Sequence, residues 1–395
     1  MRMMSWLMQT YNRCDVVFVQ GAGLKLYTAT GEIYWDYLSG IGVNNLGHCH
    51  PAVVNAVKEQ AGKLLHVSNL YRIAQQEALA EELAAISGLD RVFFCNSGAE
   101  ANEAMIKLAR RYQREVRGED RFEVITALNS FHGRTYGALA ATGQPKYQRG
   151  FEPLGAGFKY VPYNDLAALE EAISPQTALV LLEPVQGEGG IYPATREYLE
   201  GVSRLCREHG VLLGLDEVQT GVGRCGSFYA YQRMGIRPDL VSSAKALAGG
   251  LPIGALLATA EVAQGFVPGT HASTFGGGPL VTAAALAVVR IVKQQEFLEE
   301  VEKIGGYLEA AILAAAGDDI VELRRLGLML GIQFGPAVEV KQLNQALFNK
   351  EKILANALAN NTLRLLPPLI ATEADCDRFA EALARQIKDL KEGQV

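Results

Sequence analysis

Short apolar runs alternate with longer segments of helical periodicity through the middle of the chain. Six runs have the length and composition of buried strands: residues 91–95, 122–128, 178–183, 211–216, 239–245 and 253–259. Amphipathic segments, such as residues 102–116 and 195–210, separate several of them. Strands separated by helices of this length predict a mainly parallel sheet covered on both faces, and therefore an α/β fold.

The pattern changes near residue 280, where long helical segments lead to short strands and a final helix. Thr372 opens that last helix with a capping-box pattern. Near the N-terminus, a hairpin is predicted around Gly31. We therefore predict a large domain over residues 51–284 and a smaller α+β domain formed by residues 1–50 together with residues 285–395.

One lysine lies in an apolar stretch at the end of a predicted strand. Lys245 is the only charged residue between Asp239 and Glu261. Open parallel sheets bind ligands beyond the carboxyl ends of their strands, and a lysine removed from water shifts toward its neutral, nucleophilic form. Lys245 is therefore either an ordinary loop residue or a reactive amine held in a dry pocket.

A strand, a loop of small residues and a helix follow one another over residues 91–110. Ser97 is placed to cap the helix, and Glu100 completes an S-x-x-E pattern. The backbone N–H groups of Gly98 and Ala99 would then lie at the positive end of the helix, which can bind a phosphate. An ordinary capped helix is the alternative. The loop lacks the G-x-G-x-x-G and P-loop patterns, which disfavours a dinucleotide or ATP site.

Two other predicted strands end in acidic residues. Asp216 and Glu217 close one of them, and Glu183 closes the other. A carboxylate at the mouth of an apolar strand needs a partner, which is either a structural arginine or the protonated nitrogen of a ring. These acids, the phosphate-binding loop, Phe131 and Lys245 together suit an aldehyde cofactor with a phosphate arm and a pyridine ring. The lysine would form a Schiff base with it, and the ring would act as an electron sink.

Composition narrows the choice of partners. The 395 residues are 49% hydrophobic, with a formal net charge of −6, so a nucleic-acid partner is not expected. The apolar runs are too short to cross a membrane and the start resembles no secretion signal, so we expect a cytoplasmic protein. His48, Cys49 and His50 raise the possibility of a metal site, but Pro51 starts a predicted helix there, with apolar residues at helical spacing through Leu64 and Leu65, and we expect no metal.

Taken together, the motifs resemble those of the class III, or ω-, aminotransferases, which use pyridoxal 5′-phosphate (PLP). The resemblance runs over essentially the whole chain through LGHCHP (46–51), NSGAEANEAMIKLAR (96–110), SFHGRT (130–135), EPVQGEGG (183–190), LDEVQTGVGR (215–224), AKALAGGLPIGA (244–255), HASTFGG (271–277) and LRLLPPL (363–369). It implies the PLP-dependent transferase fold of type I, with a mainly parallel seven-stranded sheet in the large domain and a smaller α+β domain. Within the family, the likeness is strongest to enzymes that act on N2-acetylornithine.

The resemblance also implies roles for the cofactor-binding residues. Lys245 would carry the cofactor as a Schiff base, and Asp216 would pair with the pyridine nitrogen. Gln219 would bond the ring hydroxyl, and Phe131 would stack on the ring. Thr274 would reach the phosphate from the second subunit of a homodimer. The implied cofactor set is Ser97, Gly98, Ala99, Phe131, Asp216, Glu217, Val218, Gln219, Lys245 and Thr274.

Two arginines are implied as ligands of substrate carboxylates. Arg134 would bind one carboxylate, with Ser273 close to the substrate. Arg364 would bind the α-carboxylate of glutamate, and Glu188 would shield it while the longer amine is bound, which makes a switchable ion pair. The alternative is that Arg364 is a surface residue. The implied substrate set also contains Tyr11 and Ile41.

The expected reaction moves the δ-amino group of N2-acetyl-L-ornithine to 2-oxoglutarate, giving N-acetyl-L-glutamate 5-semialdehyde and L-glutamate in arginine biosynthesis. The apolar Ile41 suits an acylated α-nitrogen better than a charged one. Ornithine, 4-aminobutyrate, N-succinyl diamines and lysine-pathway substrates stay open. So do a PLP aminomutase or decarboxylase and a non-catalytic PLP-binding protein. Ala246, Ala248 and Gly278 depart from the residues usual in the family, and their effect is also open.

Overall fold

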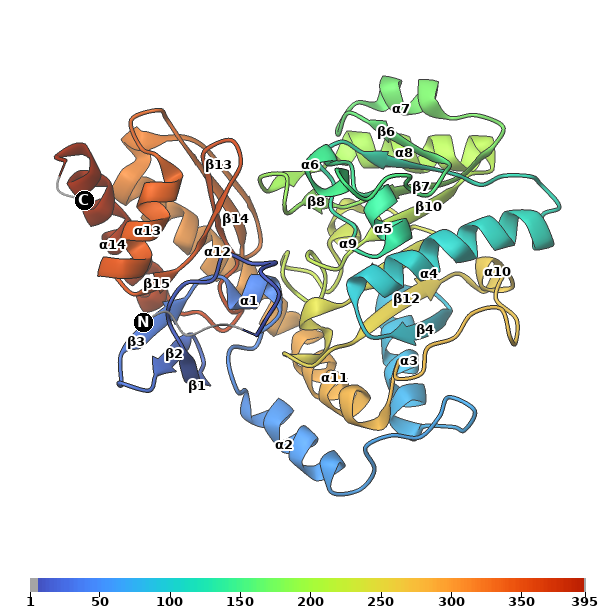
Figure 1. Ribbon diagram of the computed structural model, residues 1–395, viewed down its shortest axis with the longest axis horizontal. Helices are drawn as coiled ribbons and strands as arrows, with labels where there is room; N and C mark the ends of the chain where they lie inside the picture. The colour runs from blue at the N-terminus through green and yellow to red at the C-terminus, as the bar shows by residue number, and fades with distance from the viewer. Residues whose placement is uncertain (1–5, 394–395) are drawn as a thin grey trace.

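A seven-stranded sheet lies at the centre of the larger part of the molecule in the computed structural model, which describes residues 6–393 (Figure 1). The strand order is β4-β12-β11-β10-β7-β5-β6. The strand β12 runs antiparallel to both of its neighbours, and the other neighbouring pairs are parallel. The predicted mainly parallel sheet is therefore confirmed. Its strands are β4 (Arg91–Cys95), β5 (Glu123–Ala127), β6 (Phe158–Val161), β7 (Thr177–Leu182), β10 (Leu212–Asp216), β11 (Leu240–Ser243) and β12 (Gly254–Ala258).

One strand of this sheet was not predicted. The strand β6 lies at the sheet edge and pairs only with β5. Of its four residues, Val161 alone is buried. An edge strand with one buried side chain has no continuous apolar run, so the pattern that revealed the six central strands is missing here.

Helices cover both faces of the large sheet. Along β7, Leu179 and Leu181 pack into one core with Met105 of α4, whereas Val180 and Leu182 pack into another, as the two-residue period of a strand requires. The helices of this part are α2 (Pro51–Ala61), α3 (Ala74–Ser87), α4 (Gly98–Arg111), α5 (Tyr136–Ala141), α6 (Pro145–Gln148), α7 (Leu166–Ala172), α8 (Arg196–His209), α9 (Ala230–Met234), α10 (Ala260–Ala263) and α11 (Pro279–Val292).

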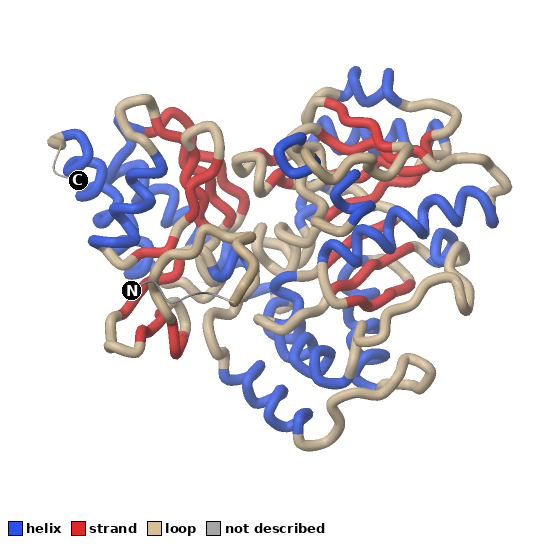
Figure 2. The backbone as a smooth tube through the Cα atoms, viewed as in Figure 1, coloured by secondary structure: helices blue, strands red, loops and turns tan. Residues whose placement is uncertain are grey.

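The chain segments near the two termini build the smaller part together. In Figure 1 the blue N-terminal strands lie beside the orange and red C-terminal elements, and Figure 2 shows the strands of this part as a group separate from the large sheet. The short β15 (Ile353–Leu354) pairs with β3 (Ile33–Asp36). A shared core joins Leu24 and Tyr37 to side chains from α12, β14 and α14.

Two four-stranded sheets belong to this smaller part, in the orders β1-β2-β3-β15 and β13-β14-β17-β16. The strands β2 and β3 form the hairpin predicted around Gly31, and the predicted capping box at Thr372 is present. The remaining elements of this part are α1 (Ser39–Gly42), β1 (Phe18–Ala22), β2 (Lys25–Thr28), α12 (Gln295–Ala316), β13 (Ile320–Leu326), β14 (Met329–Phe334), α13 (Val340–Lys350), β16 (Asn356–Leu358), β17 (Thr362–Leu365) and α14 (Glu373–Lys391). The strands β8 (Val185–Gln186) and β9 (Tyr192–Pro193) form a separate two-stranded sheet.

The predicted boundary between residues 284 and 285 needs a correction. It falls inside α11, which packs on α2 and α3 and places Leu286, Val289 and Val292 in the core of the large sheet. A single packed helix cannot be divided between two cores, so the large part continues to the end of α11. With that change, the division into two domains stays a prediction.

A second correction concerns the helix that starts at Pro51. The predicted apolar face ran on through Leu64 and Leu65, but α2 ends at Ala61, where Gly62 caps it. Leu64 and Leu65 are therefore exposed, at 47% and 60%. The apolar side chains of Leu64 and Leu65 follow the predicted spacing, but no other part of the described chain packs over them.

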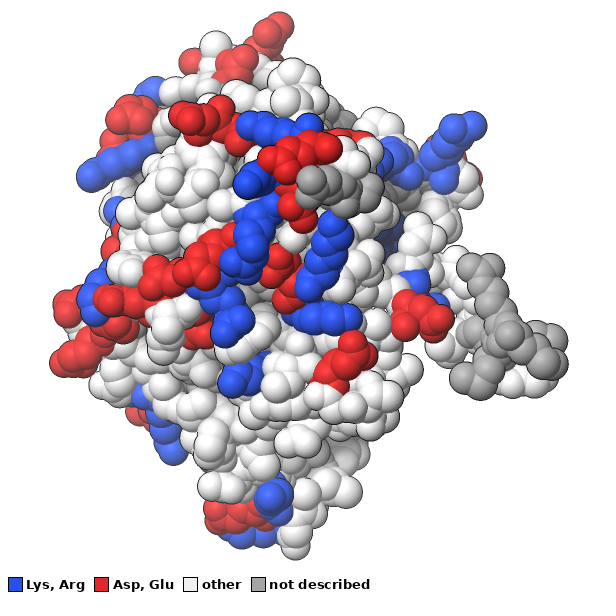
Figure 3. All heavy atoms as spheres, turned by 90° about the vertical axis from the view of Figure 1, so that its left-hand side faces the viewer, with Lys and Arg blue, Asp and Glu red and all other residues white. Residues whose placement is uncertain are grey.

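Charges of both signs are interleaved on the face of the smaller part (Figure 3). Arg385 pairs with Glu351 at 2.9 Å, and Lys352 pairs with Glu32 at 3.0 Å. Exposed pairs of this kind contribute little to stability. Within residues 6–393, no helix is long and apolar enough to cross a membrane.

Candidate active site

A cavity of about 270 Å³ opens at the carboxyl ends of β7 and β10. It lies where open α/β sheets bind their ligands. The first turn of α4, the loop after β5 and the segment that begins at Lys245 also contribute to its wall. The lining residues are Gly98, Ala99, Asn102, Phe131, His132, Gly133, Arg134, Glu183, Val185, Asp216, Val218, Gln219 and Lys245.

Lys245 follows the end of β11 by two residues and starts a single 3-10 turn that ends at Ala248. Its backbone has φ +44°, a conformation that costs energy for a residue with a side chain. Burial lowers the pKa of its ammonium group to about 8, against the opposing effect of the nearby Glu188. About half of the lysine is therefore neutral near pH 8, as expected for the amine in a dry pocket. Ala246 and Ala248 are buried in the core of the large sheet.

Asp216 ends β10 and is only 4% exposed. Its Oδ2 accepts hydrogen bonds from Asn102 Nδ2 at 2.7 Å and from His132 Nδ1 at 2.8 Å, and its Oδ1 accepts one from Val218 N at 3.0 Å. Within residues 6–393, no lysine or arginine forms an ion pair with it. The interpretation of a structural arginine is therefore wrong, and the acid faces the cavity.

Sequence reasoning missed His132 and Asn102, which hold this acid. Both are fully enclosed, and His132 Nε2 has no partner within the described chain. Two signals were available. His132 lies between Phe131 and Arg134 in a segment already singled out, and Asn102 follows Gly98 by four residues, which places both on one face of α4.

The start of α4 presents free backbone donors to the cavity. Ser97 Oγ accepts a hydrogen bond from Glu100 N at 3.2 Å, as predicted. The Glu100 carboxylate, however, bonds Asn96 N at 2.7 Å instead of closing the predicted box on Ser97. The N–H groups of Gly98 and Ala99 have no acceptor among the described residues. A side chain at Gly98 would come within 2.6 Å of Val218, so glycine is required for this close approach.

The aromatic side of the cavity carries the first arginine. Phe131 donates its backbone N–H to Glu183 Oε2 at 3.2 Å, and its ring meets the ring of Tyr147 edge to face, with centroids 5.8 Å apart. The guanidinium of Arg134 lies 4.0 Å from the Tyr147 ring centroid. This arginine is exposed and holds no carboxylate among the described residues.

The second arginine is buried and paired. Arg364 is 1% exposed, and its Nη1 bonds Glu188 Oε1 at 2.6 Å while its Nη2 bonds Asn356 Oδ1 at 2.8 Å. Gln219 Oε1 accepts a longer bond of 3.4 Å from the same Nη1. Burial opposes ionisation of Glu188, but Arg364 outweighs it, so the pKa of Glu188 is lowered. The interpretation of Arg364 as a surface residue is wrong.

Several residues predicted for the site lie outside the cavity lining. Ser273 Oγ accepts hydrogen bonds from Asn96 Nδ2 and Gly276 N, and Thr274 is exposed. Tyr11 is 70% exposed. These three residues would need the substrate or a second subunit to complete their predicted contacts.

Ile41 and Glu217 differ from the expectation in other ways. Ile41 is exposed and has φ +65°, which is strained for a branched residue, and Gly42 beside it packs near Gln219. Glu217 directs its carboxylate away from the cavity, where it accepts hydrogen bonds from Tyr231 N and Thr220 Oγ1. Burial raises the pKa of Glu217 to about 7.

The alternative metal site at His48, Cys49 and His50 does not form a cluster. His48 Nε2 bonds Asp36 at 2.8 Å, and the His50 side chain caps α2. Across residues 6–393, no group of three or more His, Cys, Asp or Glu side chains is placed to hold a metal ion.

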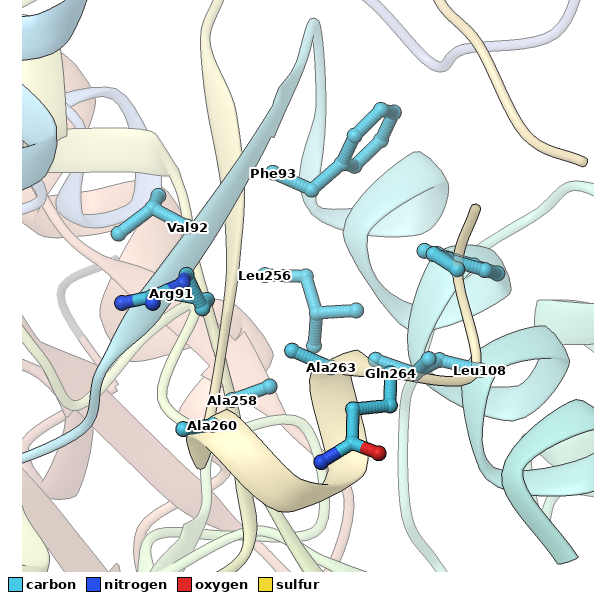
Figure 4. Close-up of a pocket in the computed structure, with 10 residues that line it drawn as sticks. Arg91, Val92, Phe93, Leu108, Leu256, Ala258, Ala260, Ala263 and Gln264 are labelled. Atoms are coloured by element: carbon cyan, nitrogen blue, oxygen red, sulfur yellow. The ribbon is translucent and has the colours of Figure 1, made fainter. Parts of the chain in front are cut away.

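A larger hollow, of about 580 Å³, lies elsewhere on the large sheet. Phe93 of β4, Leu256 of β12 and Leu108 of α4 form much of its wall (Figure 4). Among the residues that the structure describes, Arg91 is the one charged residue that lines it. An apolar wall without an acid, a base or a nucleophile in proximity supplies no catalytic group, so chemistry and not volume marks the candidate site.

A buried lysine, an acid at a strand end and a helix N-terminus meet around one cavity, which suits a PLP-dependent transaminase of fold type I. The chain belongs to the class III aminotransferases, because the family model Aminotransferase class-III matches residues 8–387.

Known relatives resemble the chain over nearly its full length. It is 46% identical over 390 residues to the acetylornithine aminotransferase of Caldanaerobacter subterraneus, with 98% of each chain covered. It is 48% identical over 398 residues to that of Thermosynechococcus vestitus, with 97% of this chain and 95% of the relative covered.

Solved structures agree with these sequence matches. The ornithine aminotransferase from Toxoplasma gondii superposes with a TM-score of 0.93 at 30% identity, over 98% of this chain and 94% of the other. The N-acetylornithine aminotransferase from Stenotrophomonas maltophilia superposes with a TM-score of 0.85 at 34% identity, over 97% of this chain and 98% of the other. A second Toxoplasma gondii structure is described with PLP at its active site.

Proposed function

We propose that the protein transfers the δ-amino group of N2-acetyl-L-ornithine to 2-oxoglutarate, as a step of arginine biosynthesis. The observation that carries the proposal is the buried ion pair between Arg364 and Glu188 beside the cavity. A site that alternates between an ω-amine and glutamate needs a cation that is available to one substrate and masked from the other. The relatives named acetylornithine aminotransferase support this choice of amine.

The cavity suits PLP as the cofactor. We propose that Lys245 bonds covalently to it, that Gly98 and Ala99 N–H groups bind its phosphate, and that Asp216 pairs with its ring nitrogen. The free N–H groups and the acid without a cationic side chain are the matching features. When bound, PLP supplies an electron sink that lowers the barrier to removing a proton next to the amino group. Phe131 would stack on the ring and Gln219 would bond its hydroxyl, with Ser97, Val218 and Thr274 in support.

The chain's own groups perform the proton transfer. Lys245 would accept the proton of the amino-bearing carbon, because its lowered pKa of about 8 leaves about a tenth of the amine neutral at pH 7 and about half near pH 8. His132 and Asn102 keep the Asp216 carboxylate fixed and hydrogen-bonded.

Substrate recognition would use the two arginines in turn. Arg134 binds the carboxylate of acetylornithine, with Ser273, Tyr11 and Ile41 around the rest of the molecule. In the second half-reaction Glu188 moves aside, and Arg364 binds the α-carboxylate of the glutamate that forms. Ping-pong kinetics follow, because both substrates use one cavity.

A homodimer in the cytoplasm is the proposed setting. Exposed apolar side chains support a second copy on the face where Thr274 lies, and the ring contact between His66 and Phe275 joins the two segments that carry them. Those side chains are Leu64, Leu65, Leu70, Tyr71, Val267 and Phe275. Thr274 would then reach the phosphate bound in the other subunit.

The test is a screen of single half-reactions followed by absorbance. Protein loaded with PLP should show a visible band that N2-acetylornithine bleaches faster than ornithine or 4-aminobutyrate does. The substitution Lys245→Ala should abolish the band, whereas Lys58→Ala on the exposed face of α2 should keep it. A colourless wild-type protein in excess PLP would refute the proposal that PLP is the cofactor. Faster bleaching by another amine would identify that amine as the substrate in place of N2-acetylornithine.

A further inference from the structure

Two acidic residues end neighbouring strands at the cavity. The strands β7 and β10 pair in parallel with Leu182 beside Leu215, so the next residues, Glu183 and Asp216, are also side by side. Neighbouring strands are about 4.8 Å apart. Both residues line the cavity and are less than 10% exposed. Two carboxyl groups therefore share a small, dry volume.

The two acids have unequal hydrogen-bond donors. Asp216 accepts three bonds, from Asn102, His132 and Val218. Glu183 accepts one, from the backbone N–H of Phe131. Donors stabilise the ionised form of an acid, and two adjacent carboxylates in a dry site disfavour double ionisation. Of the two acids, Glu183 is therefore the one that keeps its proton.

We infer that Glu183 is a further ligand-binding residue of this site: a neutral carboxylic acid that accepts a hydrogen bond from Phe131 N and donates its own O–H to an acceptor atom of the bound cofactor. The inference deepens the proposed function, because the ligand that takes the hydrogen bond is the one proposed above. It assigns a charge state and a partner to an acid that the proposed mechanism leaves idle.

The groups around Glu183 agree with this charge state. Burial is the largest cause that raises the pKa of Glu183 well above its usual range, and Asp216 adds to it. Lys245 acts in the opposite direction, and Glu188 raises the pKa further. Tyr163 packs on the same residue by donating its hydroxyl to the Glu183 backbone oxygen at 2.6 Å.

A neutral Glu183 also serves the lysine. An ionised Glu183 would favour the ammonium form of Lys245, as the nearby Glu188 already does. When Glu183 is protonated, it no longer raises the pKa of Lys245, so a larger fraction of the lysine amine is neutral. The acid therefore adds a hydrogen-bond donor to the cavity without adding charge.

The first test measures the charge state on the full chain without PLP. Unfolding of the wild type is compared with Glu183→Gln by denaturant titration from pH 5 to pH 8. In this window an unfolded glutamate has lost its proton and a neutral buried one has kept it, so the wild type loses stability relative to the variant as pH rises. The expected slope approaches tenfold in the relative unfolding equilibrium constant per pH unit.

Two further variants complete this test. Glu183→Met, which also lacks the charge, should show the same slope and serves if the Gln variant does not fold. Glu170→Gln, on the exposed face of α7, should show none. A flat or rising relative stability for both Glu183 variants would overturn the inference, since it would mean that the acid is ionised in the folded protein.

The second test measures the hydrogen bond to the ligand, with PLP as the probe. Gln keeps a neutral donor at this position, whereas Met of similar size does not. We expect Glu183→Gln to bind PLP within about threefold of wild type and Glu183→Met to bind at least about tenfold more weakly. Equal losses in both variants would overturn the donor role. Failure of the wild type to bind PLP would refute the proposed function, while the stability test would still decide the charge state.

Discussion

The two arginines proposed to bind carboxylates have opposite surroundings. Arg364 is buried, and its guanidinium donates hydrogen bonds to Glu188 and Asn356 and a longer one to Gln219. Arg134 is exposed, and its guanidinium lies over the ring of Tyr147 without an acid. The same side chain is therefore masked at one position and open at the other.

This difference assigns each arginine a different task. An open cation on an aromatic face can take any carboxylate that arrives, at little cost in reorganisation. A buried cation with a bonded acid can take a carboxylate only when the acid leaves, so it selects between substrates. Arg134 therefore provides the contact available to either substrate, and Arg364 provides the contact that selects between them.

The largest effect should separate the two arginines by stability. Arg364→Ala leaves Glu188 half-buried without its cation, and breaking such a buried pair costs roughly 3 kcal/mol. Arg134→Ala removes an exposed ring contact, worth less than about 1 kcal/mol. Denaturant unfolding of both variants at pH 7.5 measures the difference. Similar losses in the two variants would contradict the contrast in burial.

An intermediate effect should appear in the half-reactions of Glu188→Gln. The amide cannot hold Arg364 by charge, so the arginine stays available to glutamate. We expect the rate at which acetylornithine bleaches the PLP form to fall about tenfold relative to the rate with glutamate, because the site no longer discriminates between the two amines. Rapid-mixing absorbance with each amine measures the ratio. Glu200→Gln, on the exposed face of α8, is the control, and an unchanged ratio in Glu188→Gln would rule out the switch.

The smallest effect should be a shift in pH dependence. Capture of PLP by the PLP-free protein requires the neutral amine of Lys245, so its rate should rise with pH around a midpoint near 8. Glu188 is the foremost group that raises this pKa. In Glu188→Gln the midpoint should therefore move to lower pH, whereas Arg134→Ala should leave it in place. A stopped-flow pH series tests both, and a shift to higher pH would contradict the assignment.

Periodicity predicted most of the central fold because its strands are buried on both faces. Every residue of β7 and β10 is buried, so these strands appear as uninterrupted apolar runs. The edge strand β6 escaped for the opposite reason. The run through Leu64 and Leu65 was assigned to a packed helix because periodicity shows which side chains avoid water, not which molecule covers them.

The site was predicted as far as its residues end strands or begin helices. Lys245, Asp216 and the Gly98 turn are marked by such positions along the chain. Contacts between distant segments leave no such mark, which is why the bonds of Asp216 with His132 and of Arg364 with Asn356 emerged only in three dimensions. Glu217 adjoins Asp216, but successive residues at a strand end point in opposite directions, so the Glu217 side chain lies outside the cavity.

The pairing of β3 with β15 has a consequence for how the protein is made. Tyr34 and Lys352, which flank this pairing, are 318 residues apart. At about 5–20 residues per second, the ribosome adds the missing strand roughly 15–60 s after the hairpin has been synthesised. The large sheet can assemble during that interval. The hairpin must wait with one edge unsatisfied, so nascent chains that pause late in translation present an open edge to chaperones or to one another.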